Sequence, residues 1–146
     1  MQRNPYSKVP VLVDGEAVIY ESAIIDEYLD EKFPNDRLMP TDLPLRAKVR
    51  IWVDYMSTRL HAAASDITHN REPDKARERM KQHLTTLDKE MAGRNYLVGE
   101  YSLADVSFIP FYTRRERYGV VIDDAYPNLK RWGEDLIARP QVAPTL

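Results

Sequence analysis

The hydrophobic pattern of this chain begins with two short apolar runs that are rich in β-branched residues. Residues 8–13 read as one strand and residues 17–20 as a second strand. Between them, Asp14-Gly15 is a strong signal for the tight turn of a β-hairpin. The start of the chain therefore predicts two antiparallel strands.

The pattern changes to a helical period after Glu21, and Ser22 is the expected N-cap of the helix that follows. One face of this helix collects the apolar positions Ile24, Ile25, Tyr28 and Leu29. The opposite face collects the acids Asp26, Glu27, Asp30 and Glu31. Residues 34–36, Pro-Asn-Asp, are expected to stop the helix.

The rest of the chain carries only helical periods. A long helix is predicted from about residue 42 to about 68, and a second over 74–91. Ser102 and Asp105 have the spacing of a capping box at the start of a third helix, in which Pro110 predicts a kink unless it lies in the first turns. A final helix is predicted over 127–138. The fold class is therefore α+β, with a hairpin and helix followed by an all-helical part.

Composition and charge argue against several classes of protein. The chain has 21 basic and 23 acidic residues, so it lacks the basic excess of a general nucleic-acid binder. No apolar run approaches the roughly 20 residues that span a bilayer. The absence of cysteine excludes disulfides and thiolate chemistry within this sequence, and the three histidines lack metal-ligand spacing. We expect no nucleic-acid partner, no membrane association, no metal, and a cytoplasmic location.

Three motifs carry a resemblance to a known family. Residues 4–15 read Asn-Pro-x-x-Lys-Val-Pro-Val-Leu-Val-Asp-Gly, residues 20–22 read Tyr-Glu-Ser, and residues 24–34 read Ile-Ile-x-Glu-Tyr-Leu-Asp-Glu-x-Phe-Pro. In order and spacing they resemble the second half of the thioredoxin-like domain of cytosolic glutathione S-transferases. The likeness is closest to the omega and tau classes and to the stringent starvation protein A group.

The resemblance extends into the rest of the chain. Ser102-Leu103-Ala104-Asp105 and Arg139-Pro140 are similar to elements of the all-helical domain of that family. It implies a truncated thioredoxin-like, glutathione-binding domain over 1–36 and an all-helical C-terminal domain over 42–146.

The resemblance also implies roles for particular residues. Pro10 would be a cis-proline, and the backbone of Val9 would pair with the cysteinyl part of glutathione. Glu21 and Ser22 would hold the γ-glutamyl end, through a negative charge for the ammonium and hydrogen-bond donors for the carboxylate. Lys8 would face the glycyl carboxylate. The pocket for the second substrate, a small electrophile, would involve helix residues Tyr55, Arg59, Tyr112, Arg114 and Arg115.

The catalytic residue is unknown. In the family, a strand–helix–strand unit precedes these motifs and carries a tyrosine, serine or cysteine that activates the thiol of glutathione. Only nine residues precede Pro10, which is too few for that unit, and neither Tyr6 nor Ser7 matches the catalytic position. The first strand would then have an open edge, so we expect either self-association, as a homodimer, or a chain that is a fragment of a longer protein.

Three functional interpretations remain open from the sequence. The first is a glutathione S-transferase-like protein that binds glutathione and conjugates it to electrophiles if the missing segment is supplied. The second is a non-catalytic module that resembles stringent starvation protein A and binds RNA polymerase, which Phe33-Pro34 and residues 38–40 match and residues 35–37 do not. The third is a purely structural helical protein.

Overall fold

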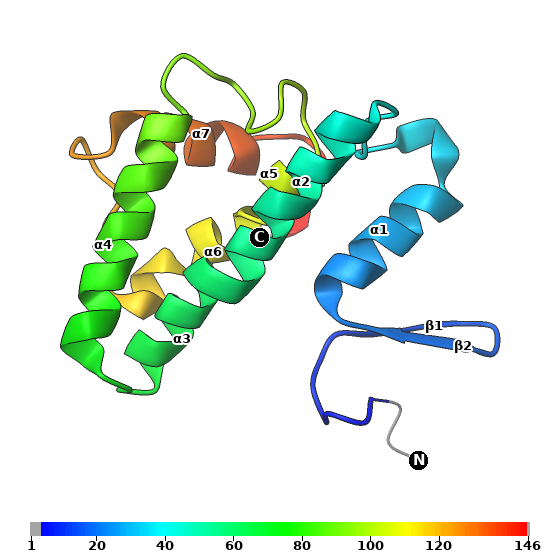
Figure 1. The fold of residues 1–146 in the computed structure, drawn as a ribbon, viewed down its shortest axis with the longest axis horizontal. Coiled ribbons are helices and arrows are strands. Elements are labelled where there is room, and N and C mark those ends of the chain that lie inside the picture. The colour runs from blue at the N-terminus through cyan, green and yellow to red at the C-terminus, as the bar shows by residue number, and fades with distance from the viewer. Residues whose placement is uncertain (1–3, 146) are drawn as a thin grey trace.

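The computed structural model describes residues 4–145 and shows a hairpin with one helix beside a bundle of helices (Figure 1). Strands β1 (Val11–Asp14) and β2 (Ala17–Tyr20) pair antiparallel, with Val11 opposite Tyr20 and Asp14 opposite Ala17. Helix α1 (Ser22–Lys32) follows and contacts both strands. The predicted α+β class, with a partial thioredoxin-like unit and an all-helical remainder, is confirmed.

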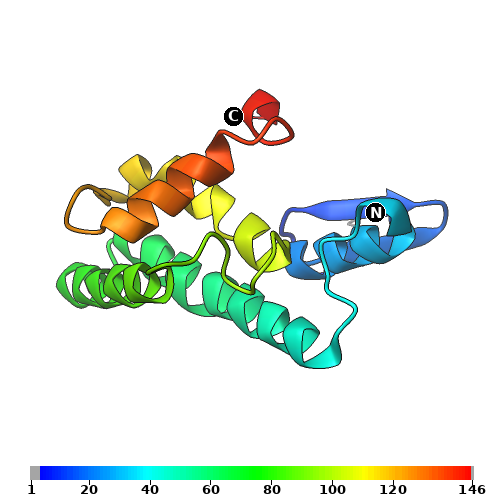
Figure 2. The ribbon, with the colours of Figure 1, turned by 90° about the horizontal axis from the view of Figure 1, so that it is seen from above.

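The helical remainder follows a short 3-10 turn, η1 (Pro34–Asp36). Its elements in chain order are α2 (Leu43–Tyr55), η2 (Met56–Leu60), α3 (His61–Thr68), α4 (Pro73–Glu90), α5 (Leu103–Val106), α6 (Ile109–Arg114), η3 (Arg115–Tyr118), α7 (Pro127–Ile137) and η4 (Ala143–Thr145). Figure 2 shows the hairpin and α1 at one end of the molecule and the bundle at the other. None of the helices within residues 4–145 combines the length and apolar character needed to cross a membrane.

The long helix predicted to begin near residue 42 is present as α2, η2 and α3 in direct succession. Asp42 caps it, because its side chain accepts a hydrogen bond from the backbone N–H of Leu45 at 2.9 Å. The middle segment, η2, is a π-helix, and its C-terminal neighbour α3 ends at Thr68 as predicted. Pro110 lies in the first turn of α6, so the sequence breaks there into α5 and α6 instead of forming one kinked helix.

The core lies inside the bundle, where the apolar stripes of its helices meet. Phe108 and Trp132 stack there at 4.3 Å between ring centroids, and both are fully buried. The apolar stripe of α4, Met80, Leu84 and Leu87, is buried. Removal of this apolar surface from water is the main force that holds the bundle together.

Two expectations for α1 are wrong. Ser22 is the first helical residue and not the N-cap, because Glu21 occupies that position without a side-chain capping bond. One position on each expected face is also misassigned: Ile24 is 57% exposed, whereas Asp30 is only 8% exposed. Asp30 is buried because its carboxylate accepts hydrogen bonds from the backbone N–H groups of Leu38 and Met39, which anchors the linker to α1.

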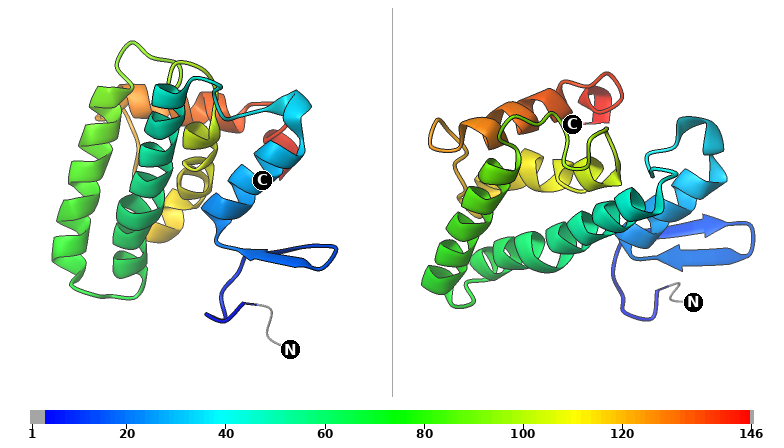
Figure 3. Two further views of the ribbon diagram at one scale, coloured as in Figure 1. Left: turned by 45° about the vertical axis from the view of Figure 1, so that its right-hand side comes forward. Right: turned by 45° about the horizontal axis from the view of Figure 1, so that its top comes forward.

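Ionic contacts join α1 to its neighbours on two sides. Asp14 at the hairpin turn accepts a hydrogen bond from the Tyr28 hydroxyl at 2.6 Å and pairs with Lys32. On the other side, Glu27 pairs with Arg50 of α2, whose Nε lies 3.1 Å from the carboxylate. These bonds hold the hairpin to α1 and hold α1 to α2 of the bundle. Figure 3 shows α1 and the hairpin beside the bundle.

Candidate functional site

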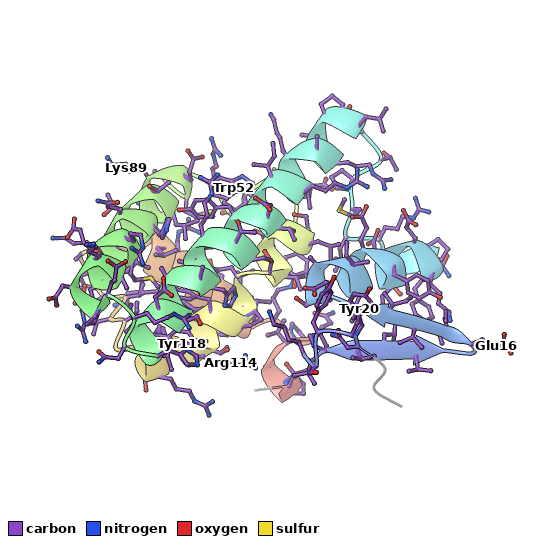
Figure 4. The ribbon with its side chains drawn as sticks, turned by 60° about the horizontal axis from the view of Figure 1, so that its bottom comes forward. Glu16, Tyr20, Trp52, Lys89, Arg114 and Tyr118 are labelled. Carbon is purple, nitrogen blue, oxygen red and sulfur yellow. The ribbon has the colours of Figure 1, made fainter. Side chains whose placement is uncertain are left out.

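The candidate site is the junction where β1 begins and β2 ends. Val11 and Tyr20 form the last pair of the ladder, so Pro10 and Glu21, the next residues along each strand, leave the hairpin at the same end. Figure 4 shows Tyr20 beside the start of α1, at the opposite end of the hairpin from Glu16 in the turn. Residues from two separate motifs therefore meet at one end of the hairpin.

Val9 presents its backbone and side chain to solvent at this end. It is 90% exposed, and the bond to Pro10 is cis, as the resemblance implies. The pairing of β1 with β2 starts at Val11, so Val9 lies outside the two-stranded sheet. An exposed backbone segment next to a strand can pair with a peptide.

Glu21 adopts an unusual backbone conformation. Its φ of 71° and ψ of 116° lie outside the regions that are easily accessible to a residue with a side chain. Such conformations cost on the order of 1–3 kcal/mol and concentrate at ligand-binding sites. Glu21 joins β2 directly to α1, and its side chain is exposed at this junction.

The first turn of α1 offers donors to an anion. The carbonyl of Glu21 already accepts from the N–H groups of Ile24 and Ile25, at 3.0 and 2.9 Å. In the described part of the chain no side chain caps this helix, so the N–H groups of Ser22 and Ala23 point out of its N-terminus without an intrahelical partner. Together with the exposed Ser22 hydroxyl and the helix dipole, they form an anion-binding environment.

The loop before Val9 is held by Asn4, which sequence reasoning did not select as a site residue. Its side chain is buried, donates to the carbonyl of Lys8 at 2.8 Å and accepts from the N–H of Tyr6 at 2.8 Å. The Lys8 side chain is exposed next to the site. Asn4 begins the first motif of the resemblance, and an asparagine directly before a proline is a turn signal.

Comparison with known proteins decides the family. The chain matches the family model "Glutathione S-transferase, C-terminal domain" over residues 51–140 and "Glutathione S-transferase, N-terminal domain" over residues 1–37. It belongs to the cytosolic glutathione S-transferase superfamily. The ordered motifs, more than any single one, had indicated this membership.

Relatives and solved structures agree with this assignment. A probable glutathione S-transferase of Nicotiana tabacum is 32% identical over all of this chain and 70% of its own length. A stringent starvation protein A homolog of Haemophilus ducreyi is 32% identical over 82% of this chain and 58% of its own length. The structure of a sphingomonad glutathione S-transferase complexed with glutathione superimposes with a TM-score of 0.85 at 27% identity, over 99% of this chain and 75% of that one.

The residues expected to line a second-substrate pocket form two local pairs in this glutathione S-transferase-like fold. Tyr55 donates to or accepts from His83 Nδ1 at 2.8 Å and carries Arg59 over its ring, on α2 and η2. Tyr112 is only 2% exposed and stacks under Arg115, on the separate pair α6 and η3. Their role in a pocket stays a prediction, and Tyr112 is part of the core.

Proposed function

We propose that this chain binds glutathione at the junction of the hairpin and α1. The exposed backbone of Val9 pairs with the cysteinyl residue of the tripeptide. The N-terminus of α1 and the Ser22 hydroxyl bind the γ-glutamyl carboxylate, and Glu21 pairs with the neighbouring ammonium. Lys8 attracts the glycyl carboxylate. Cis-Pro10 lies between these groups.

One observation carries the proposal. The strand register brings an exposed peptide segment and an uncapped helix N-terminus to the same end of the hairpin, at a residue with a strained backbone. These features match the two chemical halves of a γ-glutamyl peptide, an amide backbone and a carboxylate. The family membership and the glutathione-bound sphingomonad structure support the same ligand.

The proposal assigns binding of glutathione to this chain, and conjugation to a small electrophile as the reaction of the completed site. That reaction also needs a group that stabilises the sulfur of glutathione as a thiolate. We assign no residue of this chain to that role.

Calorimetry with glutathione tests the proposed site. Replacement of Ser22 by alanine removes a hydrogen bond to a charged group, which contributes about 1.5–3 kcal/mol, so binding should weaken by roughly tenfold or more. Ser57→Ala, at an exposed serine of η2, is the matched control and should bind glutathione like the parent chain. Equal affinity of the Ser22 and Ser57 variants, or no heat with the parent chain, would contradict the proposal.

A second candidate function is supported by the Haemophilus ducreyi relative. The chain is then a non-catalytic module that binds RNA polymerase, in line with the match at Phe33-Pro34 and residues 38–40. Phe33 is 57% exposed, so it is available to a partner. Capture of purified RNA polymerase by the immobilised chain, lost in Phe33→Ala, together with no heat from glutathione, would favour this function over the first.

A further inference from the structure

The loop that leads into Val9 is closed from inside by one asparagine. Asn4 is only 4% exposed, and its side-chain amide is bonded at both ends within the loop. Its Nδ2 donates to the carbonyl of Lys8 at 2.8 Å, and its Oδ1 accepts from the N–H of Tyr6 at 2.8 Å. Asn4 therefore ties the start of this loop to the residue directly before Val9.

Two further contacts make residues 4–8 a compact loop. The N–H of Ser7 donates to the backbone carbonyl of Asn4 at 3.0 Å, which closes a turn. The Tyr6 ring contacts the Tyr20 ring edge-on, with 5.9 Å between the ring centroids. Because Tyr20 is the last residue of β2, this contact attaches the loop to the same end of the hairpin as the candidate site (Figure 4).

Ser7 shows that the loop is held in a conformation that it would not adopt freely. Its φ of 57° lies in the left-handed region, which residues with a side chain seldom occupy. Such a conformation persists where the surrounding contacts determine it. The Asn4 side chain provides contacts on both sides of Ser7, at Tyr6 and at Lys8. Without them, we expect the loop to relax and the backbone of Val9 to change its position.

Asn4 does not have the properties of a residue that binds a ligand directly. Its side chain is buried, and both its Nδ2 and its Oδ1 already have partners within the loop. Val9, in contrast, is 90% exposed and directly follows the residue whose carbonyl Asn4 holds. An effect of Asn4 on a bound peptide therefore passes through the position of the Val9 backbone.

We propose that Asn4 is a positioning residue for the cysteinyl part of glutathione, because it fixes the Val9 backbone before the tripeptide binds. This inference rests on the proposed glutathione site. A loop that is already held in its bound conformation loses less conformational freedom on binding, which raises the affinity. The proposed γ-glutamyl contacts are at Ser22 on α1, which is attached separately, to the hairpin through Tyr28 and to α2 through Glu27. Loss of Asn4 should therefore affect one half of the ligand.

NMR and calorimetric titrations with glutathione test this one-sided effect. Asn4→Ala should weaken binding at least about tenfold, and at saturating glutathione the shift of the Val9 amide should fall to less than about half of that in the parent chain. The shifts of the Ser22 and Ala23 amides should persist, which general damage to the site would not produce. Asn95→Ala, at an exposed asparagine in the loop after α4, is the matched control and should behave like the parent.

Asn4→Ser is a second variant, and it separates the two side-chain bonds. Its hydroxyl can accept from the N–H of Tyr6, as serine does in turns, but it is too short to reach the Lys8 carbonyl. We expect this variant to fold and to lose the Val9 shift as the alanine variant does. The spectrum without glutathione shows whether a variant is folded, because the amides of the bundle should then match those of the parent.

Three outcomes would overturn the inference while leaving the proposed glutathione site intact. Either folded variant could bind glutathione like the parent, or the shifts at Val9 and Ser22 could decline together. Neither variant might fold, in which case Asn4 supports the whole chain and not this loop in particular. Absence of binding by the parent chain itself would contradict the proposed glutathione site, and this inference with it.

Discussion

Asp105 is a buried carboxylate on which four donors converge. It accepts from the backbone N–H groups of Leu97 and Ser102, from the Ser102 hydroxyl, and from Trp132 Nε1, all at 3.0–3.2 Å. Burial raises its pKa, while these donors act in the opposite direction. The capping box expected from the sequence is present, and it also connects α5 to the preceding loop and to α7.

Asp105→Ala should destabilise the chain strongly, because it leaves buried donors without an acceptor. Each unsatisfied buried donor costs about 1–3 kcal/mol, so we expect a loss of at least about 3 kcal/mol in urea unfolding. Asp124→Ala removes an exposed carboxylate that pairs with Lys130 and should cost less than about 1 kcal/mol. Similar losses for the two variants would show that the Asp105 network does not stabilise the fold.

His61 makes stability depend on pH. Burial lowers its pKa below the ordinary value of 6.5, and Arg114 acts in the same direction, whereas a bond to the Ser107 backbone opposes them. The unfolded chain therefore takes up a proton that the folded chain does not, and stability is lost as pH falls below about 6.5. The slope from one such proton is at most about 1.4 kcal/mol per pH unit.

Urea unfolding between pH 7 and pH 5.5 measures this effect. His61→Gln should flatten the decline, whereas His69→Gln, at an exposed histidine, should leave it as it is in the parent. His83, whose pKa burial also lowers, accounts for part of the remaining slope. If the parent chain gains stability on acidification over this range, the assignment of a neutral His61 is wrong.

At the scale of elements, α6 and α7 approach each other at Gly133. A Cβ built on this residue would overlap the ring of Tyr112, which is buried and cannot move away easily. Alanine favours a helix over glycine by about 1 kcal/mol, but overpacking a core costs about 1–3 kcal/mol. Glycine at this position is therefore a packing requirement.

Gly133→Ala should consequently lower the free energy of unfolding by about 1–2 kcal/mol, in spite of its better helix propensity. Thermal and urea unfolding measure the change. Glu134→Ala, at the exposed neighbouring position of α7, is the control and should shift stability by less than about 0.5 kcal/mol. A stabilised Gly133 variant would mean that the two helices are further apart than described.

The sequence predicted the elements well where the run of periodic apolar positions was long and its ends carried strong signals. Helix α4, with its buried stripe, and α7, with Leu129, Trp132 and Leu136 buried, follow from spacing alone. The faces of α1 did not, because Asp30 is buried by bonds to a linker that is distant in sequence. No local pattern reports such a tertiary contact.

The site was less accessible from the sequence than the fold. The motifs around Val9-Pro10 and Glu21-Ser22 indicated which residues to examine only through their family resemblance. The positive φ of Glu21 displaced the expected N-cap by one residue, and a single sequence contains no signal for that strain. Asn4 was missed because its buried bonds form within a loop.

At the scale of the molecule, the hairpin is a two-stranded sheet within the described residues, with unpaired strand edges. Val13 and Val18, which pair across the strands, are 40% and 42% exposed. Such a sheet is marginal by itself and offers edges to another chain. The expected homodimer therefore remains a prediction that involves this surface.

Sedimentation equilibrium should show concentration-dependent self-association, and Val13→Lys should weaken it, because lysine on an exposed strand discourages edge pairing. Val121→Lys, at a valine that is 70% exposed in the loop before α7, is the matched control. A monomer at all concentrations, or equal effects of the two substitutions, would contradict involvement of the hairpin.

The most direct test of the central claim is an NMR titration of the ¹⁵N-labelled chain with glutathione. The proposed site predicts saturable shifts that are largest for the amides of Val9, Ser22 and Ala23, on the two sides of the junction. Absence of saturable shifts at millimolar glutathione, or shifts confined to the helical bundle, would contradict the claim that the hairpin and the start of α1 form the glutathione site.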